Sequence, residues 1–202
     1  PYVWFLLICA VWGSSFILMK RATDCLSPTA VSSSRVLLGA AVLGIMWWFV
    51  GQRRVIRRAD WGPLAGIIVI GFVWPFTLQP WLISKHQNSS FIGMLVAFTP
   101  LLTIAVSTVM LRTMPTVRQT VGVLGALACL SLLMWDGWKH AMPAADLLLA
   151  VSVQLSYAIA NTWMRKSLSH IPAMELTFLC LFSSGLILLP FALTTLQIEN
   201  FR

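Results

Sequence analysis

Long apolar runs alternate with short polar gaps along almost the whole chain. Each run is about twenty residues long, the length that an α-helix needs to cross the hydrocarbon core of a membrane. The runs are continuous, whereas strands of a membrane β-barrel alternate apolar and polar positions over about ten residues. The pattern predicts an all-α polytopic membrane helix bundle with seven spans: Tyr2–Met19, Pro28–Val50, Trp61–Ser84, Ser89–Leu111, Val117–Trp135, Ala144–Met164 and Pro172–Leu193.

Prolines interrupt two of the predicted spans. Pro75 and Pro80 lie in the third span and Pro100 in the fourth. Each proline removes a backbone hydrogen bond and frees a carbonyl group, which hydrocarbon tolerates only against protein or a wet cavity. Two interpretations stay open, namely kinks that serve packing and bends that line a cavity.

Composition and charge support a membrane protein. Of the 202 residues, 58% are hydrophobic and 10% charged, against about 25% charged in an ordinary soluble domain. The net charge of +8 does not indicate a nucleic-acid partner, because the basic residues occupy loops, where charge sets orientation. With the N-terminus inside, the inner loops hold eight basic residues, Arg53, Arg54, Arg57, Arg58, Arg112, Arg118, Arg165 and Lys166. The outer side holds five, Lys20, Arg21, Lys85, Lys139 and Arg202. This asymmetry predicts a cytoplasmic N-terminus.

A faint internal repeat relates the first span to the sixth. Trp12 corresponds to Tyr157, and the basic pair at 20–21 corresponds to the pair at 165–166. Copies that are five spans apart point oppositely through the bilayer, and inverted repeats are typical of secondary transporters with a substrate site near the midplane. We therefore predict a first repeat of five helices at 1–136 and the start of a second, truncated repeat of two helices at 144–202. The alternative is an accidental match, because basic pairs commonly end membrane spans.

The ends of the chain fit a fragment. The chain begins at Pro1 rather than Met and is apolar at Tyr2, so we expect the natural start to be missing. The first span is not predicted to be a cleaved signal peptide, because no basic segment precedes it. A complete second repeat would add about three helices, which gives ten in all, of which seven are seen.

Four motifs stand in a characteristic order: Trp12-Gly13-Ser14-Ser15 with Lys20; Pro28 followed by Arg35; Asn88-Ser89-Ser90 through Thr99-Pro100-Leu101-Leu102; and Gln119 to Gly122. Their order and spacing resemble the EamA-like branch of the drug/metabolite transporter superfamily. The resemblance implies a transporter of two inverted five-helix repeats that moves small metabolites, amino acids or drug-like compounds across a bacterial inner membrane, often outward, with no cofactor. The chain has Arg112-Thr113 where the family usually has Gly-Glu, which leaves the substrate open.

The sixth span carries the best candidates for substrate contact. Polar residues at spacings of three, four and four place one stripe on one helix face: Gln154, Tyr157, Asn161 and Arg165. Such a stripe faces the bundle interior or water rather than lipid. Tyr157 offers an aromatic surface, and Asn161 offers two donors and an acceptor. The alternative role is hydrogen bonding between helices.

Four further residues are weaker candidates for the binding site. Trp12 and Trp74 lie deep enough in their spans to line a cavity. Thr99 belongs to a hydroxyl stripe with Thr103 and Ser107, for which close packing is the competing explanation. Arg35 lies about 10 Å along its helix from Pro28, so it either snorkels to the outer surface or captures an anionic group.

Other functional classes lack a recognisable set of residues. His86, His140 and His170 lie in separate loops, and no catalytic residue or metal site is predicted. The four cysteines show no CxxC spacing and are predicted to pack. No acidic residue sits near the centre of a span, so proton coupling has no candidate. An integral-membrane enzyme acting on lipid-linked substrates and a receptor-like protein are the alternatives to a transporter, and a homodimer is an open alternative to a monomer.

Overall fold

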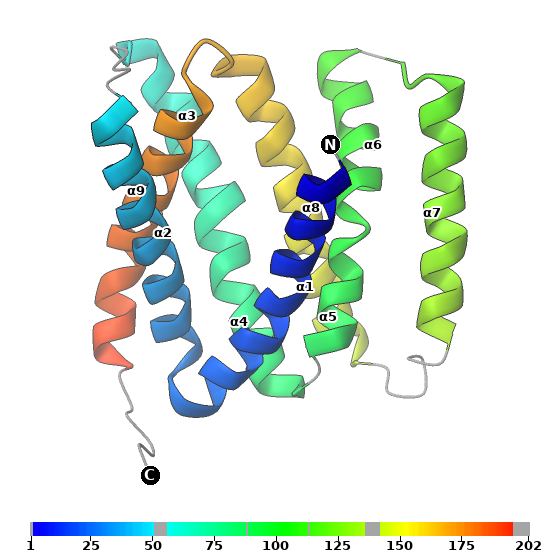
Figure 1. Cartoon of the computed structure of the whole chain (residues 1–202), viewed down its shortest axis with the longest axis horizontal. Coiled ribbons are helices and arrows are strands. Elements are labelled where there is room, and N and C mark those ends of the chain that lie inside the picture. Colours follow the sequence, from blue (N-terminus) through cyan, green and yellow to red (C-terminus); the bar gives the residue numbers. More distant parts are fainter. Residues whose placement is uncertain (1, 51–55, 88, 113, 136–141, 196–202) are drawn as a thin grey trace.

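The computed structural model describes the chain except residues 1, 51–55, 88, 113, 136–141 and 196–202. The described residues form helices joined by short turns, with no strand among them. The helices cross the molecule in alternate directions, so that α8 and α9 run opposite to α1 and α2 (Figure 1). The elements are α1 (Tyr2–Cys25), α2 (Pro28–Val50), the 3₁₀ helix η1 (Arg58–Asp60), α3 (Trp61–Ile68), the π-helical turn η2 (Val69–Val73), α4 (Trp74–His86), α5 (Ser89–Val96), α6 (Thr99–Leu111), α7 (Val117–Trp135), α8 (Ala144–Ser167) and α9 (Ala173–Thr194).

Six helical stretches in the described chain are long and apolar enough to cross a membrane: Leu6–Cys25, Pro28–Phe49, Arg58–His86, Ser89–Leu111, Ala144–Ser167 and Ala173–Thr194. The apolar stretch described in α7, Val117–Cys129, is shorter than a full span. The sequence therefore predicts the helical segments correctly, and six of its seven spans meet the length criterion. Helix α1 continues past the predicted end at Met19 to Cys25, because no helix-breaking residue intervenes before Ser27-Pro28.

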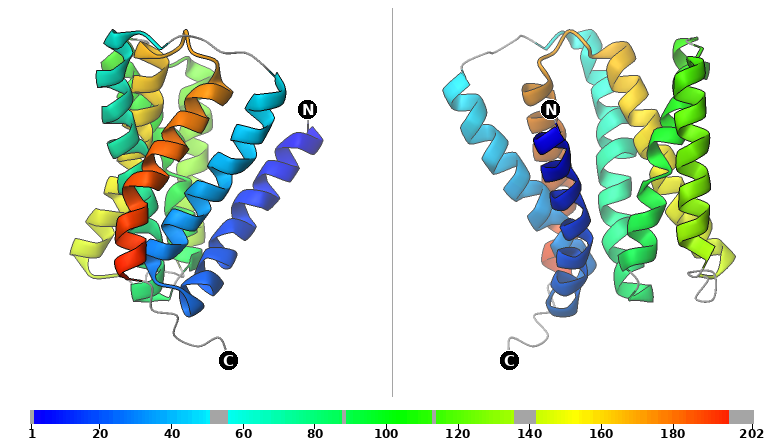
Figure 2. Two further views of the ribbon diagram at one scale, coloured as in Figure 1. Left: turned by 90° about the vertical axis from the view of Figure 1, so that its left-hand side faces the viewer. Right: turned by 45° about the vertical axis from the view of Figure 1, so that its right-hand side comes forward.

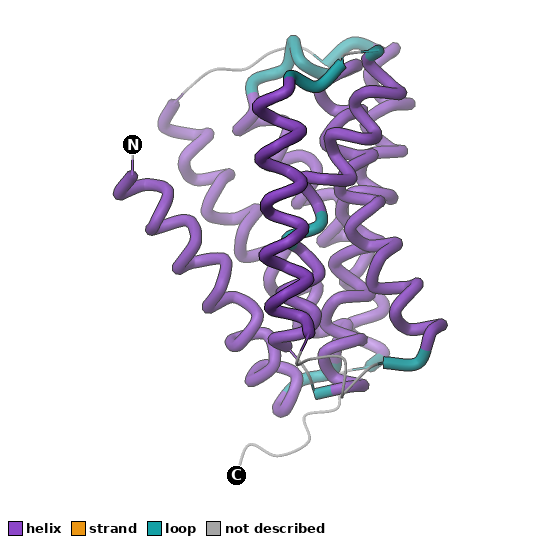
Figure 3. The backbone as a smooth tube through the Cα atoms, turned by 90° about the vertical axis from the view of Figure 1, so that its right-hand side faces the viewer, coloured by secondary structure: helices purple, strands orange, loops and turns teal. Residues whose placement is uncertain are grey.

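The third and fourth spans are each built from two helical pieces. In the third, the π-helical turn Val69–Val73 comes shortly before Pro75, where a wider turn makes room for a residue that cannot donate a backbone hydrogen bond. The fourth is interrupted at Ala97-Phe98, and Figure 3 shows this interruption as a teal turn at mid-height. Pro100 is the second residue of α6, in the first turn, where a missing N–H costs little. Pro80 lies inside α4, which continues through it.

Two helix contacts organise the bundle. Helices α2 and α9 pack along each other's length, while α8 lies between α6 and the third span. A side chain at Gly71 would place its Cβ 2.4 Å from the Cβ of Ala160 on α8. Only glycine allows the third span and α8 to approach this closely. Helix α1 leans away from the other helices toward its N-terminal end (Figure 2).

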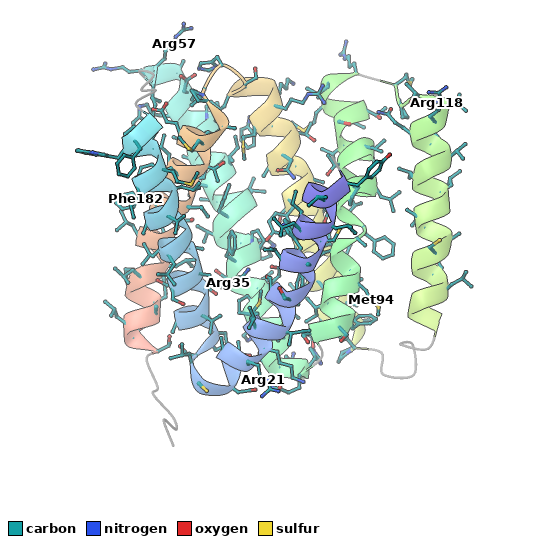
Figure 4. The ribbon with its side chains drawn as sticks, in the orientation of Figure 1. Arg21, Arg35, Arg57, Met94, Arg118 and Phe182 are labelled. Carbon is teal, nitrogen blue, oxygen red and sulfur yellow. The ribbon has the colours of Figure 1, made fainter. Side chains whose placement is uncertain are left out.

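Basic residues gather at one end of the bundle, as the loop assignment predicts. Figure 4 shows Arg57 and Arg118 at one end and Arg21 at the other, and we call these the Arg57 end and the Arg21 end. Arg53, Arg54, Lys139 and Arg202 belong to the same prediction but lie outside the described residues. A cytoplasmic Arg57 end stays a prediction.

Candidate functional site

A cavity of about 1010 Å³ lies between α1, the middle of the third span, the fourth span and α8. Aromatic rings form much of its wall: Trp12, Phe16, Phe72, Phe76 and Tyr157. Polar groups reach it at several points: Ser89, Ser90, Thr99, Thr103 and Asn161. The cavity therefore presents flat apolar surfaces with a few hydrogen-bonding groups, which is the usual character of a small-molecule site.

Interruptions in the helices make this space. Gly71 in the π-helical turn lines the cavity, and so do Ala97 and Pro100 at the break between α5 and α6. Small residues complete the wall, because Gly13 and Gly93 leave room where a larger side chain would fill the space. Pro75 and Pro80 are both buried but do not line this cavity. The breaks associated with Pro75 and Pro100 thus lie at the level of the cavity.

Tyr157 and Asn161 of α8 both line the cavity. The Tyr157 hydroxyl lies 3.5 Å from Oε1 of Gln79 on α4, which turns the ring toward the space between the helices. Asn161 lies one helical turn further along and is exposed to the cavity. The structure thus brings together the two residues that the helical spacing favours for substrate contact.

Thr99 and Gln154 are joined directly. The Thr99 hydroxyl donates a 2.8 Å hydrogen bond to Oε1 of Gln154, and Nε2 of Gln154 lies 3.5 Å from the Ala150 carbonyl. Gln154 is 1% exposed and does not line the cavity, whereas Thr99 does. Gln154 therefore links α8 to α6 and holds Thr99 in the cavity wall.

Of the two tryptophans, only Trp12 lines the cavity. Trp74 points elsewhere, and its indole N–H donates a 3.2 Å hydrogen bond to the Ser152 hydroxyl. The reason is helical geometry, because residues two apart on an α-helix, such as Trp74 and the cavity-lining Phe76, point to roughly opposite sides. Trp74 thus lies outside this cavity, and its contact with substrate stays a prediction.

Arg35 turns into the bundle instead of toward the membrane surface. Its Nη2 lies 3.4 Å from Oγ of Ser15 and its Nη1 3.4 Å from Sδ of Met19, and its Cζ lies 5.7 Å from the centre of the Phe76 ring. Ser15 is ten residues from the end of α1, or about 15 Å along the axis. The guanidinium therefore does not snorkel outward, and it sits behind Phe76, a residue of the cavity wall.

A second, more polar cavity of about 530 Å³ adjoins the first. Thr103 and Asn161 line both. Its other polar lining residues are Ser107, Thr108, Thr116, Gln119, Thr162 and Arg165. The Thr103 and Ser107 hydroxyls donate to carbonyls of their own helix, so this stripe is satisfied internally and still borders the cavities. The second cavity lies on the side of the first that faces the Arg57 end, since Thr116, Gln119 and Arg165 line it.

Residues 1–135 match the model of the EamA-like transporter family. The chain belongs to the EamA-like transporter family. It is therefore a multi-pass membrane protein, from a family of transporters rather than enzymes, and the resemblance drawn from its motifs is confirmed. No solved structure matches this EamA-like chain.

One curated relative of this EamA-like chain is the S-adenosylmethionine/S-adenosylhomocysteine transporter of Chlamydia muridarum (strain MoPn / Nigg). The two are 31% identical over 155 residues, which cover 72% of this chain and 48% of the relative. The chain thus spans about half the length of the relative it matches.

Sequence reasoning missed two buried aspartates of this EamA-like protein. Asp60 lies 3.1 Å from Nε2 of His170, and Asp146 lies 2.8 Å from Nε2 of His86. Both histidines are therefore paired with acids rather than isolated, while His140 lies outside the described residues. No signal in the sequence joins these partners, which are 110 and 60 residues apart.

The remaining thiols and acids do not build a metal site. In the part of the chain that the structure describes, no group of three or more His, Cys, Asp or Glu side chains could hold a metal ion. All four cysteines are free, and Cys180 is buried while Cys9, Cys25 and Cys129 are exposed. Cys180 packs inside the bundle, and packing of the other three cysteines stays a prediction.

Proposed function

We propose that the protein is a secondary transporter that exports small metabolites by alternating access, with the cavity between α1, the third span, the fourth span and α8 as its substrate site. The observation that carries this proposal is the cavity itself, whose aromatic walls meet the polar groups of Thr99 and Asn161 between membrane-spanning helices. Its volume of about 1010 Å³ lies at the upper end of the range that small-molecule sites occupy.

S-adenosylmethionine and S-adenosylhomocysteine are the first substrates to test. The relative from Chlamydia muridarum is named for their transport. Both molecules carry an adenine ring, which can stack on the rings of Trp12 and Tyr157, and a carboxylate, which can approach the guanidinium of Arg35. The Cζ of Arg35 lies 5.7 Å from the centre of the Phe76 ring, which lines the cavity, and we propose that rotation of this ring brings the positive charge to the cavity.

The opposite directions of the helix pairs support the proposed inverted repeat. Helices α8 and α9 run opposite to α1 and α2 (Figure 1). Trp12 and Tyr157, which correspond in the repeat, both line the cavity. We propose ten helices in the complete protein, with this chain supplying the first repeat and two helices of the second. We also propose a cytoplasmic Arg57 end, because that end carries more of the basic loop residues.

The test is transport by the full-length protein in vesicles loaded with radiolabelled S-adenosylmethionine. Tyr157→Ala and Asn161→Ala should each reduce the rate at least tenfold, or about 1.4 kcal/mol, at unchanged protein level in the membrane. Leu155→Ala is a matched control, because Leu155 lies on α8, is 40% exposed and does not line the cavity. Full activity of both variants would remove these residues from the site. Absence of transport by the native protein would exclude this substrate, and a sensitised host exposed to drug-like compounds then tests export of other cargo.

A further inference from the structure

Two ionic contacts hold opposite ends of one pair of helical segments. The third span (η1 to α4) and α8 lie side by side and run in opposite directions (Figure 1). Asp60, at the start of the third span, meets His170, just beyond the end of α8. Asp146, in the first turn of α8, meets Lys85 and His86 at the end of the third span. The arrangement is reciprocal, since each segment supplies the acid at one end and the histidine at the other.

Both contacts have close hydrogen-bonding geometry. At the Arg57 end, Oδ2 of Asp60 accepts a 2.9 Å hydrogen bond from the Arg57 backbone N–H and lies 3.1 Å from His170 Nε2. At the Arg21 end, Asp146 lies 2.8 Å from both Nζ of Lys85 and Nε2 of His86. The two aspartates are 7% and 4% exposed. Burial of a carboxylate is costly unless such partners are present, so each pair favours contact between the two segments at its end.

The partners on the other side of each contact remain close to water. The side chains of Lys85 and His170 are 45% and 39% exposed. The acids lie at helix N-termini and the bases at or beyond helix C-termini, which suits the helix dipoles. If the segments part, both partners lie at the end of the bundle, where water can solvate them. Opening an end would therefore exchange an ionic contact for hydration of both partners.

Between the two contacts, glycines let the two segments pack closely. Gly71, in the π-helical turn, packs against Ala160, and a Cβ at Gly66 would lie 2.6 Å from the ring of Trp163. Two helical segments that touch at a point between their ends can rock about it, so that separation at one end brings the other ends together. The π-helical turn places an irregular segment at this pivot, and such turns occur often at functional sites.

We propose that the Asp60–His170 and Asp146–Lys85–His86 contacts are the two gates of the cavity, and that they open in alternation as the third span rocks against α8. The inference rests on the proposed function, since these two segments supply Phe72, Phe76, Tyr157 and Asn161 to the cavity wall. Asp60 and Asp146 are positioning residues. Their side chains do not contact the substrate, and their ionic contacts determine which end of the cavity is open to water.

The test measures access to the cavity from each side without any substrate. Thr103→Cys, in the full-length protein with its native cysteines replaced, serves as the reporter, because Thr103 lines both cavities. A membrane-impermeant maleimide is added to right-side-out and inverted vesicles. Asp146→Asn should speed labelling from the Arg21 end by about tenfold and slow it from the Arg57 end, as expected when one charge-assisted hydrogen bond is lost. Asp60→Asn should do the reverse.

Opposite shifts in the two variants support the gates, since general loosening of the bundle would speed labelling from both sides. Shifts in the same direction, or no shift in either variant, overturn the proposal. If an aspartate variant does not reach the membrane, His86→Gln and His170→Gln make the same comparison. The labelling test and the transport test can fail separately. If the two variants shift labelling in opposite directions but the protein transports no substrate, the proposed function is wrong and the proposed gates are still supported.

Discussion

The α2–α9 contact and the α8 side of the bundle are built on different principles. Between α2 and α9 the packing is apolar and close: Val36, Ala40 and Leu188 are at most 3% exposed, and the Trp47 and Phe178 rings stack with centroids 5.5 Å apart. On the α8 side, polar side chains border two adjoining cavities. The close apolar packing of α2 and α9 suits a fixed scaffold. The polar side chains around α8 can exchange one hydrogen-bond partner for another. Substitutions in the two regions should therefore fail in different ways.

The largest expected effect concerns stability at the α2–α9 contact. A Cβ at Gly185 would lie 2.5 Å from Cδ2 and 2.9 Å from Cγ of Leu37, so Gly185→Val should lower the free energy of unfolding by about 1–3 kcal/mol through overpacking. Gly13→Val is the matched change on the cavity side, where a Cβ meets nothing within 4 Å. It should keep stability within about 0.5 kcal/mol and reduce transport, because it narrows the cavity. Denaturant unfolding in detergent measures both variants, and equal stability losses would contradict the comparison.

Substitution of two tryptophans should show whether transport depends on the cavity or on the rest of the α8 side. Trp12→Ala removes an aromatic wall and should lower the transport rate about tenfold, or ~1.4 kcal/mol. Trp74→Ala removes a ring outside this cavity that donates to Ser152, and transport should stay within about twofold of the native rate. Initial rates in vesicles, normalised to protein level, make the comparison. If Trp74→Ala lowers the transport rate more than Trp12→Ala does, the substrate site lies on the other side of α4.

The charge of Arg35 should contribute to transport and not to the stability of the fold. Its hydrogen-bond partners are the neutral groups of Ser15 and Met19, so Arg35→Met removes a charge that is costly inside a membrane bundle. The variant should unfold no more easily than the native protein, while transport of a carboxylate-bearing substrate falls about fivefold, or ~1 kcal/mol. A loss of stability with unchanged transport per folded molecule would make Arg35 structural.

The smallest effect is expected for the link between α6 and α8. Thr99→Val and Gln154→Leu each break the 2.8 Å hydrogen bond, and the double variant completes a thermodynamic cycle. The coupling free energy should be about 0.6 kcal/mol, the average for hydrogen bonds between membrane helices. A coupling near zero would show that the bond does not hold Thr99 in the cavity wall.

The sequence predicts the helices and one face of α8 well, for physical reasons. Membrane thickness fixes the length of an apolar run, so the spans follow from composition alone. The 3.6-residue period places Tyr157 and Asn161 on one side, and the low tolerance of lipid for polar groups indicates which side faces inward. Neither inference needs knowledge of the neighbouring helices.

The sequence does not predict contacts that depend on which helices are neighbours. The depth of Arg35 in its span allows it to snorkel outward or to face the bundle, and the contacts with Ser15 and Phe76 that hold it inside depend on neighbouring helices. The depth of Trp74 was predictable but its direction was not, because the π-helical turn just before it inserts an extra residue and changes the helical phase. The pairing of Asp60 with His170 follows from the antiparallel packing of the third span on α8, which periodicity does not report.

We propose that cargo passes through the cavity beside α8, and thiol modification of α6 tests this route most directly. Thr103→Cys lies where the two cavities meet, while Ala105→Cys lies two residues away on the exposed side of the same helix and lines neither. Transport by the full-length protein is measured before and after reaction with a bulky maleimide. An adduct at position 103 should abolish transport, because it fills the route, and an adduct at position 105 should leave transport unchanged. Undiminished transport with position 103 fully modified would show that cargo does not pass through this cavity.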